Sequence, residues 1–373
     1  MSNIETTLAI TKIAHGGAGI GRLPDGRICF VHGTLPGERA MVRVVKSKKN
    51  HAEADLVRLL ELSPRRVAAP CPVFGECGGC ALQHADYDLQ LEIKTSQVVE
   101  LLQRIGGIAD ADVRAMLPSP RQWAYRNRLA VHTHRKEVGF FHRKSHQLVD
   151  VKSCPIATDE VNAQLAELRA NPPRQPARIT LRAQGTARGF SQVNEGAAEL
   201  LAETVGDMAA SATLLVDAYC GSGFFSKKLR ANFQRILGIE WSDGAVRKAR
   251  EEALENETYI EGSVEAHISE ALLAAPASET VLLVDPPAEG LSADTILRIL
   301  ERPPARLVYV SCDPATFARD AKKLSGHYDV SRVQPVDMFP QTAEIELAAL
   351  FVLKSQSGST FDIAPQPHRP EPA

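Results

Sequence analysis

The C-terminal half of the chain alternates short runs of buried-strand residues with segments able to form helices. The strand candidates are TLLVDAYCGSGFF, RILGIEW, TVLLVDPP, RLVYVSC and ELAALFVLK. Continuous apolar runs of this kind are typical of parallel strands covered by helices on both faces. The pattern predicts an α/β fold, a doubly wound and mostly parallel sheet of the Rossmann type.

The N-terminal segment, from Leu8 to about Leu62, alternates short strand-like runs with glycine-rich turns. This spacing predicts a small closed β-barrel. Its glycines lie between apparent strands with no crossover helix after them, which disfavours a dinucleotide loop. The turn glycines are Gly16, Gly17, Gly19 and Gly21, and the basic residues suited to phosphate contacts are Arg39, Arg43, Lys46, Lys48, Lys49 and Arg58. On charge alone, the alternative is that these basic side chains form a solvated face of the barrel and contact no phosphate.

The chain carries 43 Lys+Arg against 45 Asp+Glu, so any basic surface must be local. One such stretch runs from Arg121 to His146, with a single acid, Glu137. In this stretch basic side chains alternate with aromatic rings. Such a mixture lets a sheet hold phosphates while the rings stack on unpaired bases, although aromatic residues also commonly pack a core. The basic residues are Arg121, Arg126, Arg128, Arg135, Lys136, Arg143 and Lys144, interleaved with Trp123, Tyr125, Phe140 and Phe141.

No apolar run approaches the roughly 20 residues of a membrane span, and the N-terminus lacks the order of a signal peptide. We therefore expect a cytoplasmic protein without membrane contact, acting as a monomer. Clustered cysteines in a reducing compartment indicate metal binding or catalysis more often than disulfides.

Four of the seven cysteines form a metal-type pattern: Cys71, Cys77 and Cys80 lie close together, and Cys154 follows at a distance. All-cysteine ligation admits zinc or an iron–sulfur cluster, and the spacing leaves the choice open. Four unrelated buried thiols are the alternative. Cys29 and Cys220 are expected to be small buried hydrophobic residues.

A cofactor loop follows the first strand of the α/β half, where Gly221 and Gly223 form a turn leading into a helix. Glycine allows a tight turn and close backbone approach to a ligand. Ser226 replaces the third glycine of a pyrophosphate fingerprint, and Glu240, about twenty residues on, could accept both hydroxyls of a ribose. These features favour an adenosine ligand without phosphates, and S-adenosylmethionine fits best.

Two further strands end in chemically useful residues, Asp285 before two prolines and Cys312 before Asp313. Ligands gather outside the carboxyl ends of strands in an open α/β sheet, so both segments should face the crevice of the glycine turn. A helix starting just after Cys312 is expected to lower the pKa of its thiol. Glu344 and Glu346 precede the last strand on one pleat, and the pattern does not separate them.

Together these residues resemble the RNA uracil-5-methyltransferase family, specifically its iron–sulfur members with an N-terminal TRAM domain. The resemblance covers about residues 5–354. It rests on HGGAGIGRLPDGRICFVHGTLPGE for TRAM, CPVFGECGGCALQH for the cluster, DAYCGSG for the cofactor turn, YVSCDPATFARD for the nucleophile and DMFPQTAEIE for the base.

The resemblance implies a 4Fe–4S cluster held by the four cysteines, Cys312 as nucleophile and Glu346 as base. It also implies S-adenosylmethionine contacts at Gln192, Tyr219, Glu240 and Asp285. The substrate would be RNA, with large-subunit ribosomal RNA favoured over transfer RNA. The chain departs from the family pattern at Phe224, Gly262, Ala288, Gln341 and Glu344.

The expected domains are a TRAM barrel over residues 1–62, a central iron–sulfur and RNA-contacting domain over 63–180, a methyltransferase domain over 181–354 and a disordered tail over 355–373. Two other functions compete. Exocyclic amino methylation is suggested by the Asp-Pro-Pro strand end, but Ala288 stands where an aromatic residue is normal. A non-catalytic RNA-binding or redox module would not need Cys312.

Overall fold

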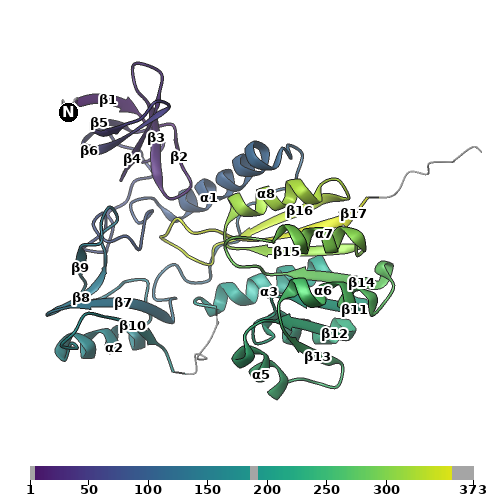
Figure 1. The fold of residues 1–373 in the computed structure, drawn as a ribbon. Helices are drawn as coiled ribbons and strands as arrows, with labels where there is room; N and C mark the ends of the chain where they lie inside the picture. Colours follow the sequence, from purple (N-terminus) through teal and green to yellow (C-terminus); the bar gives the residue numbers. More distant parts are fainter. Residues whose placement is uncertain (1–4, 185–191, 355–373) are drawn as a thin grey trace, which may run out of the picture.

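The computed structural model describes residues 5–184 and 192–354, and its strands form three sheets (Figure 1). The tail expected at 355–373 lies outside the described residues. The expected fold class is confirmed, with an N-terminal β module, a central β-rich module and a C-terminal doubly wound sheet. Among the described helices, none is both long and apolar enough to cross a membrane.

The N-terminal sheet has six strands in the order β1-β5-β6-β4-β3-β2 around one apolar core. Cys29 lies fully buried in that core, as expected. Gly19 and Gly21 lie within β3, so the expectation that they form a turn is wrong; only Gly16 and Gly17 do, with positive φ. The strands are β1 (Glu5–Ala9), β2 (Lys12–Ile13), β3 (Ala18–Arg22), β4 (Ile28–His32), β5 (Arg39–Ser47) and β6 (His51–Glu61).

The central sheet is antiparallel, with the order β10-β7-β8-β9. Its strands are β7 (Arg128–His134), β8 (Glu137–Phe141), β9 (Leu148–Asp150) and β10 (Ala177–Arg182). Helix α2 (Asp159–Ala170) packs Val161 and Leu165 into the core beneath it. Thr158 caps this helix by accepting a hydrogen bond from the Val161 amide.

The large sheet has seven strands in the order β13-β12-β11-β14-β15-β17-β16. The first five run parallel, while β17 pairs antiparallel with both β15 and β16. The strands are β11 (Ala212–Ala218), β12 (Phe233–Glu240), β13 (Glu257–Glu261), β14 (Thr280–Val284), β15 (Arg306–Ser311), β16 (Tyr328–Val336) and β17 (Glu346–Leu353). All five strand candidates of the sequence are present, and β13 and β16 were missed.

Helices cover both faces of this sheet and bury two apolar clusters against it (Figure 1). They are α3 (Glu195–Ala209), α4 (Phe224–Leu229), α5 (Asp243–Glu251), α6 (Val264–Leu273), α7 (Ala293–Glu301) and α8 (Pro314–Leu324). Capping side chains start α3, α6, α7 and α8 by accepting hydrogen bonds from first-turn amides.

Helix α1 (Tyr87–Leu101) lies between the modules, and a π-helical turn, Leu102–Gly106, continues it to Gly107. Although the sequence places α1 in the central domain, Val98, Leu101 and Leu102 pack into a core of the large sheet. The chain after α1 also joins that sheet, because Val113 and Leu117 form bridges with β16.

Three polar side chains of α1 are buried at helical spacing: Gln90, Lys94 and Gln97. The Lys94 Nζ atom lies 2.6 Å from Asp337 Oδ1, and both side chains are fully buried. The Tyr87 hydroxyl donates to the other Asp337 oxygen at 2.8 Å. Buried charges are tolerated only where they are paired and hydrogen-bonded, as this pair is.

We predict that Lys94→Met strongly destabilises the protein, by about 3–5 kcal/mol, because it leaves Asp337 buried without its cation. Arg247→Met is the matched control, since Arg247 and Asp243 form an exposed ion pair whose loss costs about 0.5 kcal/mol or less. Thermal unfolding of both variants measures the difference. Equal midpoints would contradict this role for the buried pair.

Candidate active site

The strand order brings the expected nucleophile and the expected base to one edge of the large sheet. Cys312 directly follows β15, and Glu346 begins β17. The two strands are antiparallel with Ser311 opposite Leu347, so the register places residue 346 across from residue 312. Asp285, which follows β14, lies at the same edge. Three residues distant in sequence therefore meet at the carboxyl ends of the parallel strands.

Cys312 is exposed at this edge, between β15 and α8. Helix α8 begins just afterwards, as expected, and Asp313 caps it by accepting a hydrogen bond from the Thr316 amide at 2.7 Å. The expected lowering of the thiol pKa is wrong, however. Partial burial and the carboxyl groups of Glu346 and Asp285 raise the pKa of Cys312 to about 12.

Glu346 is buried, whereas Glu344 is exposed. Glu344 lies before β17 begins, so the expectation that both glutamates share one pleated face does not hold. Burial raises the pKa of Glu346 well above its usual range, and Asp285 and Glu344 add to the shift. A carboxylate in such surroundings is a stronger base once it is ionised.

The glycine turn lies between β11 and α4, where Gly221 and Gly223 both have positive φ. A Cβ atom on Gly223 would lie 2.7 Å from the Tyr259 hydroxyl, so glycine is required there. The Glu240 carboxylate accepts hydrogen bonds from the amides of Gly221, at 3.1 Å, and Ser242, at 2.8 Å. The acid at the end of β12 thus lies beside the turn.

A second carboxyl group, that of Asp217, is fully buried beneath the turn. Its Oδ2 atom accepts from the amide and hydroxyl of Ser226, whereas Oδ1 has no hydrogen-bond partner among the described residues. Burial raises the pKa values of both Asp217 and Asp285 to about 7. The site therefore holds several desolvated carboxyl groups that a cationic ligand would stabilise.

Two other expected cofactor residues, Tyr219 and Gln192, lie next to elements of the large sheet. Tyr219 follows β11 with a φ of 65°, an uncommon conformation for a residue with a side chain. Gln192 lies just before α3, and its backbone carbonyl accepts a hydrogen bond from the side-chain amide of Asn127 at 3.1 Å. Cys220 is buried against Val246, Ala249 and Tyr259, as expected for a structural residue.

Two departures from the family pattern have local explanations. Phe224 packs against an apolar cluster of the large sheet and meets Phe225 edge-on. At Gly262, where φ is 150°, a Cβ atom would lie 2.3 Å from the His267 ring. His267 therefore occupies the space that a side chain at position 262 would need.

The four cysteines expected to bind metal line one cavity of about 200 Å³ near the central sheet. Much of the remaining lining is apolar, including Phe74, Leu129 and Phe140. The Gly79 amide donates to Cys77 Sγ at 3.4 Å. The donor set is thus four thiols with a backbone N–H directed at sulfur, which suits an iron–sulfur cluster.

Burial and the neighbouring cysteines raise the pKa values of three of these thiols: that of Cys77, that of Cys80 to about 12 and that of Cys154 to about 11. Among the described residues, no group of three His, Cys, Asp or Glu side chains is arranged to hold a metal ion. Neither a single ion nor an iron–sulfur cluster is therefore shown at this cavity, and both stay hypotheses.

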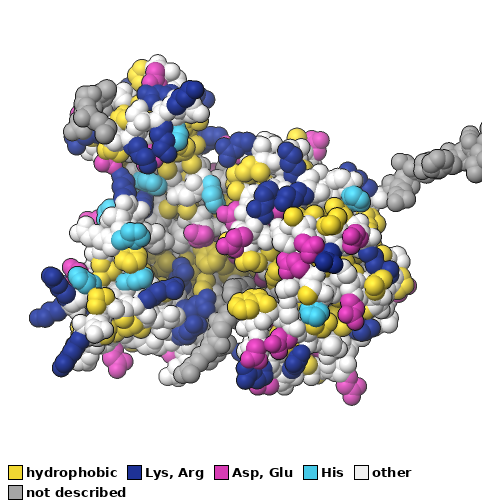
Figure 2. All heavy atoms as spheres, in the orientation of Figure 1, with side chains coloured by type: hydrophobic (Ala, Val, Ile, Leu, Met, Phe, Trp, Pro, Cys, Tyr) yellow, Lys and Arg dark blue, Asp and Glu magenta, His cyan; other side chains and the backbone are white. Residues whose placement is uncertain are grey.

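The basic and aromatic stretch 121–146 lies largely on the central sheet, where Lys, Arg and His side chains border the hollow facing the large sheet (Figure 2). Of its four aromatic residues, only Phe141 is exposed. Tyr125 is buried instead, and its hydroxyl donates to the Pro340 carbonyl. The Phe141 ring lies 4.1 Å from that of His132, centroid to centroid.

The barrel's basic residues are partly neutralised, because Arg39, Arg43 and Lys46 form ion pairs with Glu61, Glu5 and Glu53. Their contribution to a basic surface is therefore smaller than the sequence indicates.

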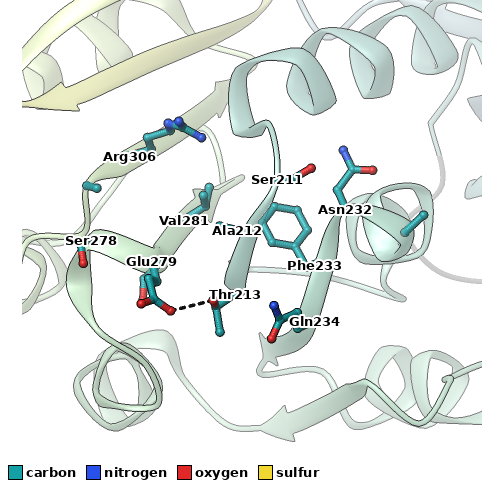
Figure 3. Close-up of a pocket in the computed structure, with 13 residues that line it drawn as sticks. Ser211, Ala212, Thr213, Asn232, Phe233, Gln234, Ser278, Glu279, Val281 and Arg306 are labelled. Atoms are coloured by element: carbon teal, nitrogen blue, oxygen red, sulfur yellow. Dashed lines mark hydrogen bonds between the residues drawn. The ribbon is translucent and has the colours of Figure 1, made fainter.

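A larger cavity, of about 580 Å³, lies at the opposite edge of the large sheet (Figure 3). It is bordered by Ala212, Phe233, Thr280 and Arg306, which begin four of the strands. Thr213 donates to Glu279 across it at 2.7 Å. Ligands of such sheets bind at the carboxyl ends, and none of the expected site residues lies in this cavity.

Two further residues lie near the site without a role predicted from the sequence: His15 was not singled out, and Gln341 was named only as a departure from the family pattern. His15, in the turn after β2, has its ring 3.9 Å from the Asp313 carboxylate beside the nucleophile. Gln341 precedes the base with a φ of 72° and is buried. The departure from the family pattern was the available signal for Gln341, and it did not indicate that the residue is buried.

Comparisons with known proteins bear on the family and the fold. A family model described as TRAM domain matches residues 5–57, and one described as tRNA (Uracil-5-)-methyltransferase matches residues 266–354. An uncharacterized RNA methyltransferase of Gloeobacter violaceus is 31% identical over 92% of this chain and 95% of its own length. One of Bdellovibrio bacteriovorus is 32% identical over 92% and 93%.

A solved structure with the same fold is the tRNA (uracil-54, C5)-methyltransferase of Pyrococcus abyssi in complex with S-adenosyl-L-homocysteine. It is 23% identical, with a TM-score of 0.71, over 92% of this chain and 99% of that one. At this identity the likeness establishes the fold.

We predict that alkylation of Cys312 by iodoacetamide is slow at neutral pH and accelerates as pH rises toward the raised thiol pKa. Asp285→Asn should speed it at pH 9, because Asp285 is then largely ionised and its loss lowers the pKa of Cys312. Each unit of lowering raises the thiolate fraction about tenfold. Peptide mass spectrometry follows Cys312, with the exposed Asp329→Asn as control. Unchanged alkylation in Asp285→Asn would contradict this electrostatic coupling.

Proposed function

The chain belongs to the RNA uracil-5-methyltransferase family, and on that premise we propose that it methylates carbon 5 of a uridine in RNA through a covalent bond to Cys312. The observation that carries the proposal is the antiparallel register that sets Glu346 across from Cys312, beside Asp285.

Cys312 acts as the nucleophile. Carbon 5 of uracil is too weak a nucleophile to take a methyl group directly, so the Cys312 thiol gives its proton to solvent, and the thiolate adds to carbon 6 and turns the ring into an enolate-like species. A bound cationic cofactor would offset the carboxyl groups that raise the pKa of the thiol. The pair of electrons from sulfur forms the new bond, and carbon 5 becomes the attacking atom. The exposure of Cys312 at the edge of the sheet supports this role.

Glu346 acts as the base that ends the reaction. After transfer, carbon 5 carries both the methyl group and its original proton. Glu346 takes that proton, the electrons restore the double bond between carbons 5 and 6, and the bond to sulfur breaks. Its burial beside the nucleophile supports this assignment over the exposed Glu344.

S-adenosylmethionine supplies an electrophilic methyl group and a positive charge when bound. The residues present fit it: the Asp217 Oδ1 atom, unpartnered among the described residues, and the raised pKa of Asp285 favour a cationic ligand. We propose that Glu240 binds the ribose hydroxyls beside the turn of Gly221 and Gly223. Tyr219, Gln192 and Asp285 complete the contacts.

We also propose that Cys71, Cys77, Cys80 and Cys154 hold a 4Fe–4S cluster. Their convergence on one cavity supports it, together with the Gly79 amide directed at Cys77 Sγ. The cluster would bind the four partly buried thiols, as thiolates, to iron. It would thereby order the loop between the barrel and α1.

The RNA target follows by analogy. A reacting uridine edge is hidden in a helix, so the target must be single-stranded or flipped out. We propose that the barrel and central sheet bind the flanking RNA, and that the substrate is 23S ribosomal RNA. Transfer RNA is the second candidate, because the Pyrococcus abyssi enzyme of the same fold is a tRNA methyltransferase. A cytoplasmic location follows from either substrate.

We predict that Cys312→Ser binds RNA but forms no 5-methyluridine, because it lacks an effective nucleophile. Glu346→Gln should instead transfer the methyl group and stay attached to the product, with turnover reduced by about 10²–10⁴-fold. Denaturing gels with methyl-labelled RNA separate the two outcomes.

Mass-spectrometric mapping of the product from ribosomal and transfer RNA identifies the target. Normal turnover of Cys312→Ser would overturn the mechanism, and would favour a different enzyme class or a non-catalytic role.

We predict that protein purified without oxygen contains four iron atoms per chain and absorbs visible light, whereas aerobic protein loses the colour. Cys154→Ser should lose iron, while Cys29→Ser, a buried barrel thiol, should keep it. Elemental analysis checks both variants. A colourless, zinc-containing and active protein would contradict the iron–sulfur assignment.

A further inference from the structure

The loop from Asp337 to Ile345, called the base loop below, joins β16 to Glu346. Most of its residues are buried, unlike those of an ordinary surface connection. A buried loop must satisfy its backbone polar groups inside the protein. Its hydrogen-bond partners therefore identify what holds the base in place.

Gln341, at the centre of the base loop, is 2% exposed. Its carbonyl oxygen accepts hydrogen bonds from two consecutive amides, those of Ala81 at 3.1 Å and Leu82 at 3.0 Å. These residues directly follow Cys80. The segment that carries Cys71, Cys77 and Cys80 is therefore hydrogen-bonded to the base loop, which lies more than 250 residues away in the sequence.

Gln90 of helix α1 pairs with the same residue in both directions. The Gln341 amide donates to Gln90 Oε1 at 3.0 Å, and Gln90 Nε2 donates to Gln341 Oε1 at 3.0 Å. Gln341 has a φ of 72°, a sparsely populated conformation that persists only where the surroundings hold it. The glutamine pair and the two amides provide that restraint.

Other donors hold the carbonyls on either side. Lys94 donates to Phe339 at 3.0 Å, and the Tyr125 hydroxyl donates to Pro340 at 2.9 Å. Asn194 donates to Met338 at 3.1 Å. Four consecutive carbonyls of the base loop are thus held by residues from outside strands β16 and β17.

We propose that Gln341 and Gln90 are positioning residues that hold the base loop, and through it Glu346, against helix α1 and against the segment 71–82, called the cysteine loop below. This inference rests on the proposed function. On this inference, α1 and the cysteine loop do more than stabilise the fold, because they also fix the position of the base.

The restraint acts on the base and not on the nucleophile. Cys312 is carried by β15 and α8, and its flanking hydrogen bonds involve Ser311, Asp313 and Thr316. Loosening the base loop should therefore displace the carboxylate and leave the thiol in place. A displacement of about 1 Å can cost about 10²-fold in a proton-transfer step.

The consequence is specific to one step. Methyl transfer needs Cys312 and cofactor, so it should proceed in a variant with a loose base loop. Proton removal from carbon 5 needs Glu346, so it should slow, and the bond from sulfur to carbon 6 should persist. The variant should accumulate methylated RNA still attached to protein.

The test compares Gln90→Leu and Gln341→Gly with Gln97→Leu in the full-length protein. Gln97 is the matched control because it is on the same helix, is 6% exposed against 1% for Gln90, and donates to Ile13 and Ala14 of the barrel instead. Gln341→Gly keeps the backbone contacts and accepts the positive φ, so it remains informative if Gln90→Leu fails to fold.

The readouts are the single-turnover rate of methyl transfer, the steady-state turnover and the fraction of protein attached to methyl-labelled RNA after denaturation. We expect both variants at the glutamine pair to transfer methyl within about threefold of the wild-type rate, while turnover falls about tenfold or more and attached RNA accumulates. Gln97→Leu should show no accumulation.

The inference is overturned if the two variants release product at the wild-type rate, if they slow transfer and release equally, or if Gln97→Leu accumulates the same adduct. Failure of the proposed function looks different. In that case the wild-type protein itself forms no adduct on Cys312.

Discussion

The insertion of β17 between β15 and β16 is the constraint on which the rest of the site depends. An antiparallel strand in this position begins where β15 ends, so its first residue lies beside the residue that follows β15. Sheet hydrogen bonds bring Cys312 and Glu346 together, and the buried base loop adds a second restraint on Glu346. Groups held by paired strands keep their separation better than groups on free loops, which a covalent mechanism with two roles requires.

The same edge gathers carboxyl groups that have lost much of their hydration. The pKa values of Asp217 and Asp285 rise to about 7, and that of Glu346 rises well above its usual range, because burial and repulsion from neighbouring carboxyl groups disfavour the charged forms. Glu346 and Asp285 also raise the pKa of the Cys312 thiol. A site with this electrostatic character favours a bound cation, and the proposed sulfonium cofactor carries that charge.

The doubly wound sheet was predictable because its strands are continuous apolar runs, and the glycine turn because Gly221 and Gly223 need positive φ. The role of helix α1 was not predictable from the sequence. Gln90, Lys94 and Gln97 have the spacing of an exposed polar face, yet they are buried against groups more than 80 residues away, which no local pattern indicates. The thiol pKa was misjudged for a similar reason, because the helix start was visible in the sequence whereas the facing carboxyl groups were not. The four cysteines were grouped correctly by spacing, and their common cavity depends on the folding of the central sheet around Cys154.

The proposed catalysis depends on a bond between Cys312 sulfur and the substrate ring, and the most direct measurement is to trap that bond. RNA containing 5-fluorouridine cannot release a proton from carbon 5, so the methylated adduct should remain attached. Peptide mass spectrometry of the trapped wild-type protein should find the nucleotide on Cys312. An adduct on another side chain, or none while natural RNA is still methylated, would contradict this mechanism.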